Sequence, residues 1–420
     1  MFKFKEANFE QEYNNECAKG IIRPANFHRQ NFSILGNFQV LDAPIRKYTY
    51  FAKAAMISCA VSALIILSLG LYHGILIRDI PFITEVGTYC IVMSYKIIIL
   101  MCTKLNVYDY HQLQHIMKEN FLYACTTGER YRKRFFYNQI FTRKICKLTL
   151  VFTSGVAVGM MSFGVFSLLF YLATHSQGEG KRPLLFPFWC FNIDFGASPV
   201  YEITFFYSCM CIFAYAINYT FMILTEIMWI REITTKADIV IWSIRDLMDG
   251  IQPTQDKREE RFFDATLKTR LSEIVKHHQS MHRLLKHYAK VYKKLLMFEQ
   301  KISAPVVCLS AYSCYVTSGD GEFNAVLLLL CVAAIILLFI PSYLCTILSM
   351  KVSSICYACW DTPFWNASPV VRPYLVLIMQ RSLRPLPLTV PGFEEVSVQT
   401  FSKKMASAYS MFNMLRQINI

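Results

Sequence analysis

Acidic residues are scarce in this sequence. Lys and Arg number 43 against 29 Asp and Glu, which leaves a formal net charge of +14 at pH 7. An excess of this kind can indicate a nucleic-acid partner. Here, however, the basic residues gather in particular loops between hydrophobic runs, which is how membrane topology distributes Lys and Arg. We therefore expect a lipid bilayer as a partner and no nucleic acid.

Familiar catalytic patterns are also missing. The sequence contains no nucleophile elbow, phosphate-binding loop or pair of catalytic carboxylates. His278 and His282 are four residues apart, a spacing that can bind a metal ion, but that basic stretch offers them no acidic or cysteine partner at ligand spacing. We therefore expect no enzyme activity, no cofactor and no metal.

The sequence also lacks the patterns of a cleavable signal and of a disulfide framework. Residues 2–30 are polar and mixed in charge, unlike a signal peptide. Most of the 15 cysteines lie inside apolar runs, where a free cysteine packs as a small hydrophobic side chain. Cys190 is the only cysteine in the proposed outer loops, so we expect no disulfide framework.

Hydrophobic sequence is abundant by contrast. Hydrophobic residues make up 54% of the 420 residues, and the mean hydropathy is +0.33. Several runs reach the length of about 20 residues that an α-helix needs to cross a bilayer. This composition predicts an all-α membrane protein with several spans. The expected spans are 54–76, 86–102, 148–173, 201–230, 295–316 and 323–350.

The end of the chain, residues 371–420, differs from these runs. Prolines and a glycine between 385 and 392 lie too close together for one continuous helix, so the last helix is predicted to be split in two. The second piece, 394–417, is long enough to cross a bilayer but carries polar side chains that hydrocarbon would reject. We expect it to line an aqueous pore. Its polar residues include Lys403, Lys404, Ser407, Ser410 and Asn413.

The loops alternate between basic and poorly basic along the chain. All the basic segments therefore fall on one side of the membrane, which the positive-inside rule makes the cytosol. This predicts an inverted topology of seven spans, with a cytosolic N-terminus and an extracellular C-terminus. The expected division is a cytosolic lead-in 1–50, spans one to four 51–230 with an outer loop 174–200, a cytosolic helical extension 231–294 that acts as an anchor, spans five and six 295–350, a cytosolic part of the last helix 351–393, and a pore-lining helix with an extracellular tip 394–420.

Several motifs in this order resemble the insect odorant receptor family, over nearly the whole chain. Each motif is degenerate alone, but their combination is specific. They are Phe186–Trp189 and Ser198–Glu202 in the outer loop, Val275–Gln279, Ser354–Trp360, Gln380–Thr389, Phe401, and Ala408–Arg416 near the end. The stretch between spans four and five lacks the long insertion of the family's co-receptor, and the Met414–Ile418 end departs from the co-receptor's terminus. The chain thus resembles an odorant-specific subunit.

The resemblance implies four seven-span subunits around one central, non-selective cation pore. It implies a small volatile odorant as ligand, a co-receptor subunit as partner in a heterotetramer, cations in the pore, and the plasma membrane of a sensory neuron as location. The cytosolic extensions would pack into an anchor that holds the tetramer together.

The resemblance also suggests where the channel narrows. In the family the gate falls at the positions of Phe412 and Leu415, and apolar rings can close a pore by dewetting. Ala408 lies on the same stripe, and a polar stripe that includes Ser410 lies elsewhere on this helix. Two readings stay open: the apolar stripe forms the gate, or it packs on spans five and six while the polar stripe faces water.

The family's ligand pocket lies in the outer half, between spans two, three, four and five. Aromatic and Met side chains there would give an apolar, shape-tolerant lining. For each candidate, ordinary packing is the alternative. The candidates are Tyr89, Met93, Phe163, Phe166, Phe206, Cys209, Tyr312 and Tyr315. Glu226 and Glu299, near inner helix ends, are expected to pair with neighbouring Arg or Lys.

Three other functions compete with an odorant-gated channel. A gustatory-type channel shares the architecture, but its typical terminal Thr-Tyr-hydrophobic motif is replaced here by Ala408-Tyr-Ser. A secondary transporter predicts internal repeats and paired broken helices, and the sequence shows neither. A metabotropic seven-span receptor requires the opposite topology.

Overall fold

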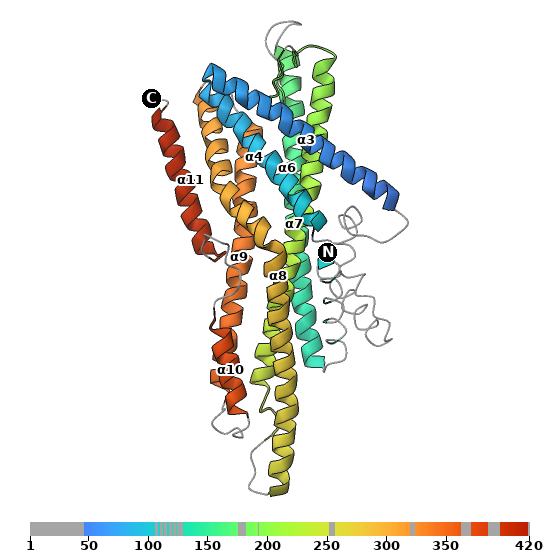
Figure 1. Ribbon diagram of the computed structural model, residues 1–420, viewed down its shortest axis with the longest axis vertical. Coiled ribbons are helices and arrows are strands. Elements are labelled where there is room, and N and C mark those ends of the chain that lie inside the picture. The colour runs from blue at the N-terminus through green and yellow to red at the C-terminus, as the bar shows by residue number, and fades with distance from the viewer. Residues whose placement is uncertain are drawn as a thin grey trace.

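The structure is a computed structural model of the chain. It describes residues 46–105, isolated positions between 108 and 123, and then 129–174, 182–191, 193–251, 257–319, 324–362, 371–384 and 395–418. Most of the predicted lead-in 1–50 lies outside these residues. The described helices are α3 (Arg46–Ile77), α4 (Ile80–Leu105), α6 (Glu129–Thr174), α7 (Val200–Arg245), α8 (Lys257–Gly319), α9 (Ala325–Asp361), α10 (Arg372–Ser382) and α11 (Val398–Ile418) (Figure 1).

Five of these helices are long and apolar enough to cross a membrane, namely α3, α4, α6, α7 and α9. The all-α membrane class expected from the sequence is therefore confirmed. Among the described helices, α8 and α11 do not reach the same apolarity. Ser303, Ser310 and Ser313 dilute the apolar end of α8, and Lys403 and Lys404 that of α11. The count of seven spans stays a prediction.

Two long helices continue without a break across the predicted boundaries between membrane span and cytosolic extension. The α7 helix continues past residue 230 to Arg245, and α8 joins the stretch 257–294 to the predicted span five in 63 residues. A hydropathy change thus marks no helix end, because a helix leaving the bilayer keeps its internal hydrogen bonds. Pro305 lies inside α8, where it cannot donate a backbone hydrogen bond to the carbonyl of Lys301.

A tight turn joins α3 to α4 in the upper part of Figure 1. Arg78 has a φ of 59°, and the next residue, Asp79, accepts a hydrogen bond from the amide of Phe82 at 3.1 Å through Oδ1. That bond satisfies a free amide at the start of α4. At Gly74 a Cβ atom would lie 2.9 Å from the Phe82 ring, so the two helices can meet this closely only at a glycine.

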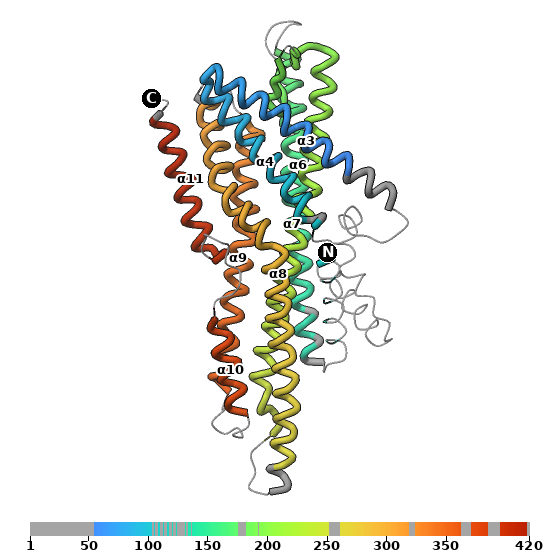
Figure 2. Tube along the Cα trace, in the orientation of Figure 1, coloured from blue at the N-terminus to red at the C-terminus, as the bar shows by residue number. Residues whose placement is uncertain are grey.

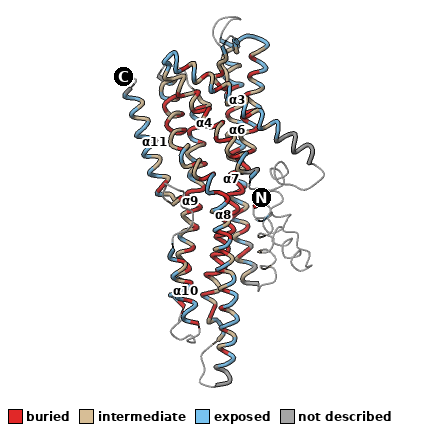
Figure 3. Tube along the Cα trace, in the orientation of Figure 1, coloured by how far each residue is buried: buried red, intermediate tan, exposed pale blue. Residues whose placement is uncertain are grey.

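The centre of the molecule is α7, which is buried on all sides over residues 218–241. It packs against α4, α6, α8 and α9, and Figure 3 shows buried segments where α7 passes α8. Trp229 is fully buried there and lies against Tyr288 of α8, with ring centroids 6.2 Å apart. A helix without an open face holds its neighbours in fixed positions.

Charged residues occur within this buried stretch, and described polar groups from other helices contact them. Asp238 accepts from Lys351 of α9 at 2.9 Å and from Asn138 of α6 at 3.2 Å. Glu232 accepts hydrogen bonds from Gln139 and Asn120. Such bonds offset the cost of removing charge from water. They also tie α6 and α9 to α7.

The last part of the chain forms two separate helices, on either side of residues 385–394. Figure 2 follows α9 down to α10 and finds α11 higher up, alongside α9. The amide of Val398 donates to Oγ1 of Thr346 in α9 at 3.0 Å. Ser397 accepts from the amide of Thr400 at 3.2 Å and so caps α11, which begins at Val398 rather than at the expected residue 394.

Candidate functional site

A cavity of about 130 Å³ lies between the helices in the half of the molecule that contains α3 and α4. Its walls come from α4, α6, α7, α8, α9 and the outer loop, and they are mostly apolar. An apolar cavity of roughly 150 Å³ is large enough to hold benzene. Representative lining residues are Tyr89, Met160, Phe186, Ile212, Val306 and Leu330.

Two of the predicted ligand residues line this cavity, and six do not. Tyr89 and Met93 of α4 are both buried, and both contribute to its wall. Phe163, Phe166 and Phe206 are exposed on the outside of α6 and α7. They lie on the helix faces that point away from the cavity. Aromatic residues alone do not indicate which face of a helix lines a cavity. Whether any of these residues binds a ligand stays a prediction.

The remaining three candidates lie elsewhere. Cys209 is partly buried against the apolar cluster around Tyr89, outside the cavity lining. Tyr312 is fully buried in α8. Tyr315 packs instead on α11: its ring lies edge-on to Phe412 at 6.0 Å, and the guanidinium of Arg416 lies 5.4 Å from its centroid.

The outer loop supplies part of the cavity wall, although none of the predicted ligand residues lies in that loop. Phe186 is 2% exposed, lines the cavity, and meets the ring of Tyr89 edge-on at 4.8 Å. Phe188 continues the aromatic contacts, 5.6 Å from Phe186. Three aromatic residues in the motif Phe186–Trp189 were the available signal, because a loop facing water has little use for them. Gly164 of α6 leaves room for Leu185 beside this loop.

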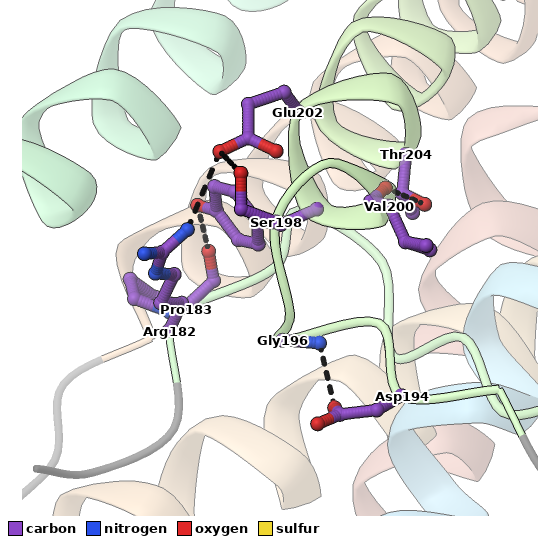
Figure 4. Close-up of polar contacts among 9 residues, drawn as sticks. Arg182, Pro183, Asp194, Gly196, Ser198, Val200, Glu202 and Thr204 are labelled. Atoms are coloured by element: carbon purple, nitrogen blue, oxygen red, sulfur yellow. Dashed lines mark hydrogen bonds and ion pairs between the residues drawn. The ribbon is translucent and has the colours of Figure 1, made fainter. Parts of the chain in front are cut away.

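Polar contacts fasten this loop to the start of α7 (Figure 4). Glu202 accepts from Arg182 at 3.3 Å and from the hydroxyl of Ser198 at 3.1 Å. The hydroxyl of Tyr201 donates to the carbonyl of Pro183 at 2.8 Å, and Arg182 also lies 5.4 Å above the Tyr201 ring. These bonds hold both ends of the segment that carries Phe186.

The polar groups of the cavity wall come from several helices: Thr220 of α7 donates a hydrogen bond to Thr153 of α6, and a further group lies on α8 and α4. Glu299 is 4% exposed and lines the cavity, together with Ser303 one turn further and Tyr95 of α4. Neither carboxyl oxygen of Glu299 has a hydrogen-bond partner among the described residues. The expected pairing with a cation holds for charge, since Lys404 of α11 interacts electrostatically with Glu299, but no hydrogen bond to the carboxyl group accompanies it among the described residues. Glu226 accepts its hydrogen bond from Tyr288 at 3.1 Å, again not from a cation.

The α11 helix packs one apolar stripe against the protein, while its exposed face carries polar side chains together with Tyr409 and Met414. Ala408 is buried against Val307 and Cys308 of α8 and Cys331 of α9, and Phe412 and Leu415 are partly buried beside it. The opposite face, which includes Lys403, Ser407, Ser410 and Gln417, is exposed. In one chain the apolar stripe thus packs on the predicted spans five and six. Its role as a gate stays a prediction.

The two histidines at metal spacing contact each other. Nε2 of His278 lies 3.2 Å from Nε2 of His282 on α8. Within the described residues, no group of three or more His, Cys, Asp or Glu side chains could hold a metal ion.

These features define the class: an all-helical, multi-pass membrane protein with an apolar cavity between its helices. A family model described as 7tm Odorant receptor matches residues 80–409, and the chain belongs to that family. The family resemblance inferred from the sequence motifs is thereby confirmed. It is a family of receptors rather than of enzymes.

Individual relatives agree with this assignment. The chain is 21% identical over 312 residues to Odorant receptor 49a of Drosophila melanogaster, covering 73% of this chain and 74% of that protein. Its fold is similar to the insect olfactory receptor OR5 from Machilis hrabei in complex with eugenol, with a TM-score of 0.73 at 15% identity over 93% of this chain and 98% of that one. A second structure of that receptor gives a TM-score of 0.71 at 15% identity, over the same shares of the two chains.

Proposed function

We propose that this chain is the odorant-binding subunit of a ligand-gated, non-selective cation channel in the plasma membrane of sensory neurons. The observation that carries the proposal is the apolar cavity lined by Tyr89, Met93 and Phe186. Its volume of about 130 Å³ suits a small volatile molecule, and its wall is mostly apolar. Membership of the odorant receptor family supports the same ligand class.

The exposed polar face of α11 supports a pore. In a bilayer such a face needs water or protein beside it. In a tetramer with a co-receptor subunit, this face lines the central path for cations. Ala408, Phe412 and Leu415 form the constriction: Phe412 and Leu415 keep part of their surface open, so a limited rotation of α11 on α8 and α9 turns them toward the pore.

The topology that fits this channel has seven spans. The upper part of α8 and the whole of α11 are the two spans that lack a continuous apolar surface, because α8 faces protein and α11 faces water. The N-terminus then lies in the cytosol and the C-terminus outside. A tag placed after Ile420 and stained on intact cells tests this; staining only after permeabilisation contradicts the channel topology and favours a metabotropic receptor.

Electrical recording tests the function directly. The chain is expressed in cells without odorant receptors, with and without the co-receptor, and whole-cell currents are measured during application of a panel of volatiles. We expect inward cation currents only with both subunits, persisting in excised patches without nucleotides. Surface-expressed complexes that give no current to any volatile would contradict the proposal.

A further inference from the structure

The cavity lining contains a single charged residue among the described positions, Glu299. It is 4% exposed, and both of its carboxyl oxygens are buried without a hydrogen-bond partner in the part of the chain that the structure describes. Burying a carboxyl group without partners is costly, and native proteins satisfy nearly all such groups. An acid in this state within a cavity therefore calls for a partner that enters the cavity.

Glu226 provides the contrast within the same fold. It is equally buried at 1% exposed, but it accepts a hydrogen bond from Tyr288 and does not line the cavity. One carboxyl oxygen of Glu226 is thus satisfied inside the protein and the other, Oε2, has no hydrogen-bond partner among the described residues, whereas Glu299 lacks a partner at both oxygens. Lys404 lies close enough to Glu299 for their charges to interact, but its printed hydrogen bond goes from Nζ to the carbonyl of Gln300 at 3.0 Å. Both carboxyl oxygens of Glu299 therefore still lack a hydrogen-bond donor among the described residues.

The surroundings of Glu299 add unsatisfied polar groups to a mostly apolar cavity wall. The hydroxyl of Tyr95 is buried without a hydrogen-bond partner among the described residues and lines the same cavity. Ser303 follows Glu299 by one helical turn and so lies on the same face of α8. The hydroxyl of Ser303 already donates to the carbonyl of Gln300 at 3.2 Å. This part of the wall therefore offers acceptors in excess of donors.

We propose that Glu299 determines ligand specificity by accepting a hydrogen bond from a hydroxyl or amine group at one end of a small apolar odorant. The apolar body of the ligand lies among Met93, Met160 and Ile212, and its polar head lies between Glu299 and Tyr95. The inference rests on the proposed function, since it names the chemical class that the cavity selects. A site built to bond a polar group rejects analogues that lack it, because its own groups then stay unpaired.

The test uses matched volatiles on cells that express the chain with the co-receptor. Each set holds a primary alcohol, the amine of the same chain length, and a methyl ether of equal size; hexanol, hexylamine and methyl pentyl ether form one set, and phenols with their methyl ethers form another. We expect the concentration for half-maximal current to be at least about ten-fold lower for a donor-bearing member than for its ether. A wild type that prefers the ethers, or that answers no donor-bearing member, overturns the inference.

Substitutions then assign the preference to Glu299. Glu299→Leu is expected to remove the preference for donors while the ether response stays. Glu299→Gln, which keeps the size, is expected to retain alcohols and lose the response to amines about ten-fold, because an amide offers no charge to an ammonium group. Glu85→Gln, at a carboxyl that accepts a hydrogen bond from Asn324 and lies outside the cavity lining, is the control and should leave the ranking unchanged. If Glu299→Leu does not reach the cell surface, the amine-to-alcohol ratio in Glu299→Gln decides alone, and an unchanged ratio counts against the inference.

Failure of the two proposals is distinguishable. An absence of current to every volatile, with both subunits at the surface, removes the channel function. Currents that ignore the head group, or that keep their head-group ranking in both Glu299 variants, remove only the role of Glu299.

Discussion

Lys404 of α11 donates a hydrogen bond from Nζ to the backbone carbonyl of Gln300 on α8, across 3.0 Å. The contact joins the proposed pore helix to Gln300, which directly follows the cavity residue Glu299 in the sequence. We expect Lys404→Met to weaken the attachment of α11 to α8 and to raise the ligand-free current about ten-fold or more, since a hydrogen bond from a charged donor contributes about 1.5–3 kcal/mol. The measurement is the ratio of basal to odorant-evoked current.

Lys403 supplies the control for this change. It is the neighbouring lysine on α11 and its side chain is exposed. Lys403→Met removes the same charge from the same helix, so equal basal currents in the two variants would mean that charge near the pore, rather than the bond to α8, sets the resting state.

The outer loop is expected to act on ligand affinity through Phe186. Phe186→Ala removes a buried ring from the cavity wall, and we expect the half-maximal odorant concentration to rise by more than about ten-fold, because the bound odorant loses its packing contacts with that ring. Glu202→Ala should shift it only about two-fold, since the Arg182–Glu202 pair is largely exposed to solvent. Phe191→Ala, at an exposed ring in the same loop, is the control. Dose-response curves with one odorant decide the order.

Leu415 separates the two readings of the apolar stripe. If it belongs to the constriction, Leu415→Ser should conduct without ligand, because a hydroxyl stabilises water in a narrow apolar ring. If it only packs on α8 and α9, the variant should lose surface expression and remain silent at rest. Ser410→Ala on the exposed face tests general damage to α11. Basal current and surface labelling are recorded in the same cells.

The lower part of α8 is expected to lose stability in acid. Burial lowers the pKa of His277, His278 and His282 to about 4, and the nearby positive charge of Arg381 acts in the same direction on His278 and His282. Their ordinary pKa is about 6.5, so between pH 6.5 and 4 the unfolded chain binds more protons than the folded one, and stability falls as the pH falls through that window.

Thermal unfolding of the purified protein in detergent, at pH 7 and pH 5, measures this loss. The double variant His278→Gln, His282→Gln should show a smaller drop in Tm between the two pH values than the wild type. An equal drop in both proteins would assign the acid sensitivity to other groups.

The family and the helical membrane class could be predicted from the sequence, because motif order and hydropathy record them directly. The sequence did not distinguish Tyr89 from Phe166, since which face of a helix meets the cavity depends on packing between helices far apart in the chain. Phe186 was visible as an aromatic residue in a loop, but the folding of that loop over the cavity depends on Gly164, Arg182 and Glu202.

Glu299 shows the limit most clearly. A glutamate in a chain with abundant Lys and Arg is expected to form an ion pair. The sequence offers Lys301 two residues away and Lys404 on the last helix. In the fold, Lys404 lies near Glu299 but donates its hydrogen bond to the carbonyl of Gln300, and Glu299 lines a cavity built from six separate segments.

Pro305 lies between Ser303 and Val306, which both belong to the cavity wall. The α8 helix therefore bends most easily at the level of the cavity, because proline removes one backbone hydrogen bond there. From Pro305 toward Lys257 the backbone hydrogen bonds of the helix continue without interruption over about 70 Å. If α8 bends at Pro305, the long rigid stretch toward Lys257 moves as one body. A small displacement beside the cavity then becomes a larger displacement at the far end of α8.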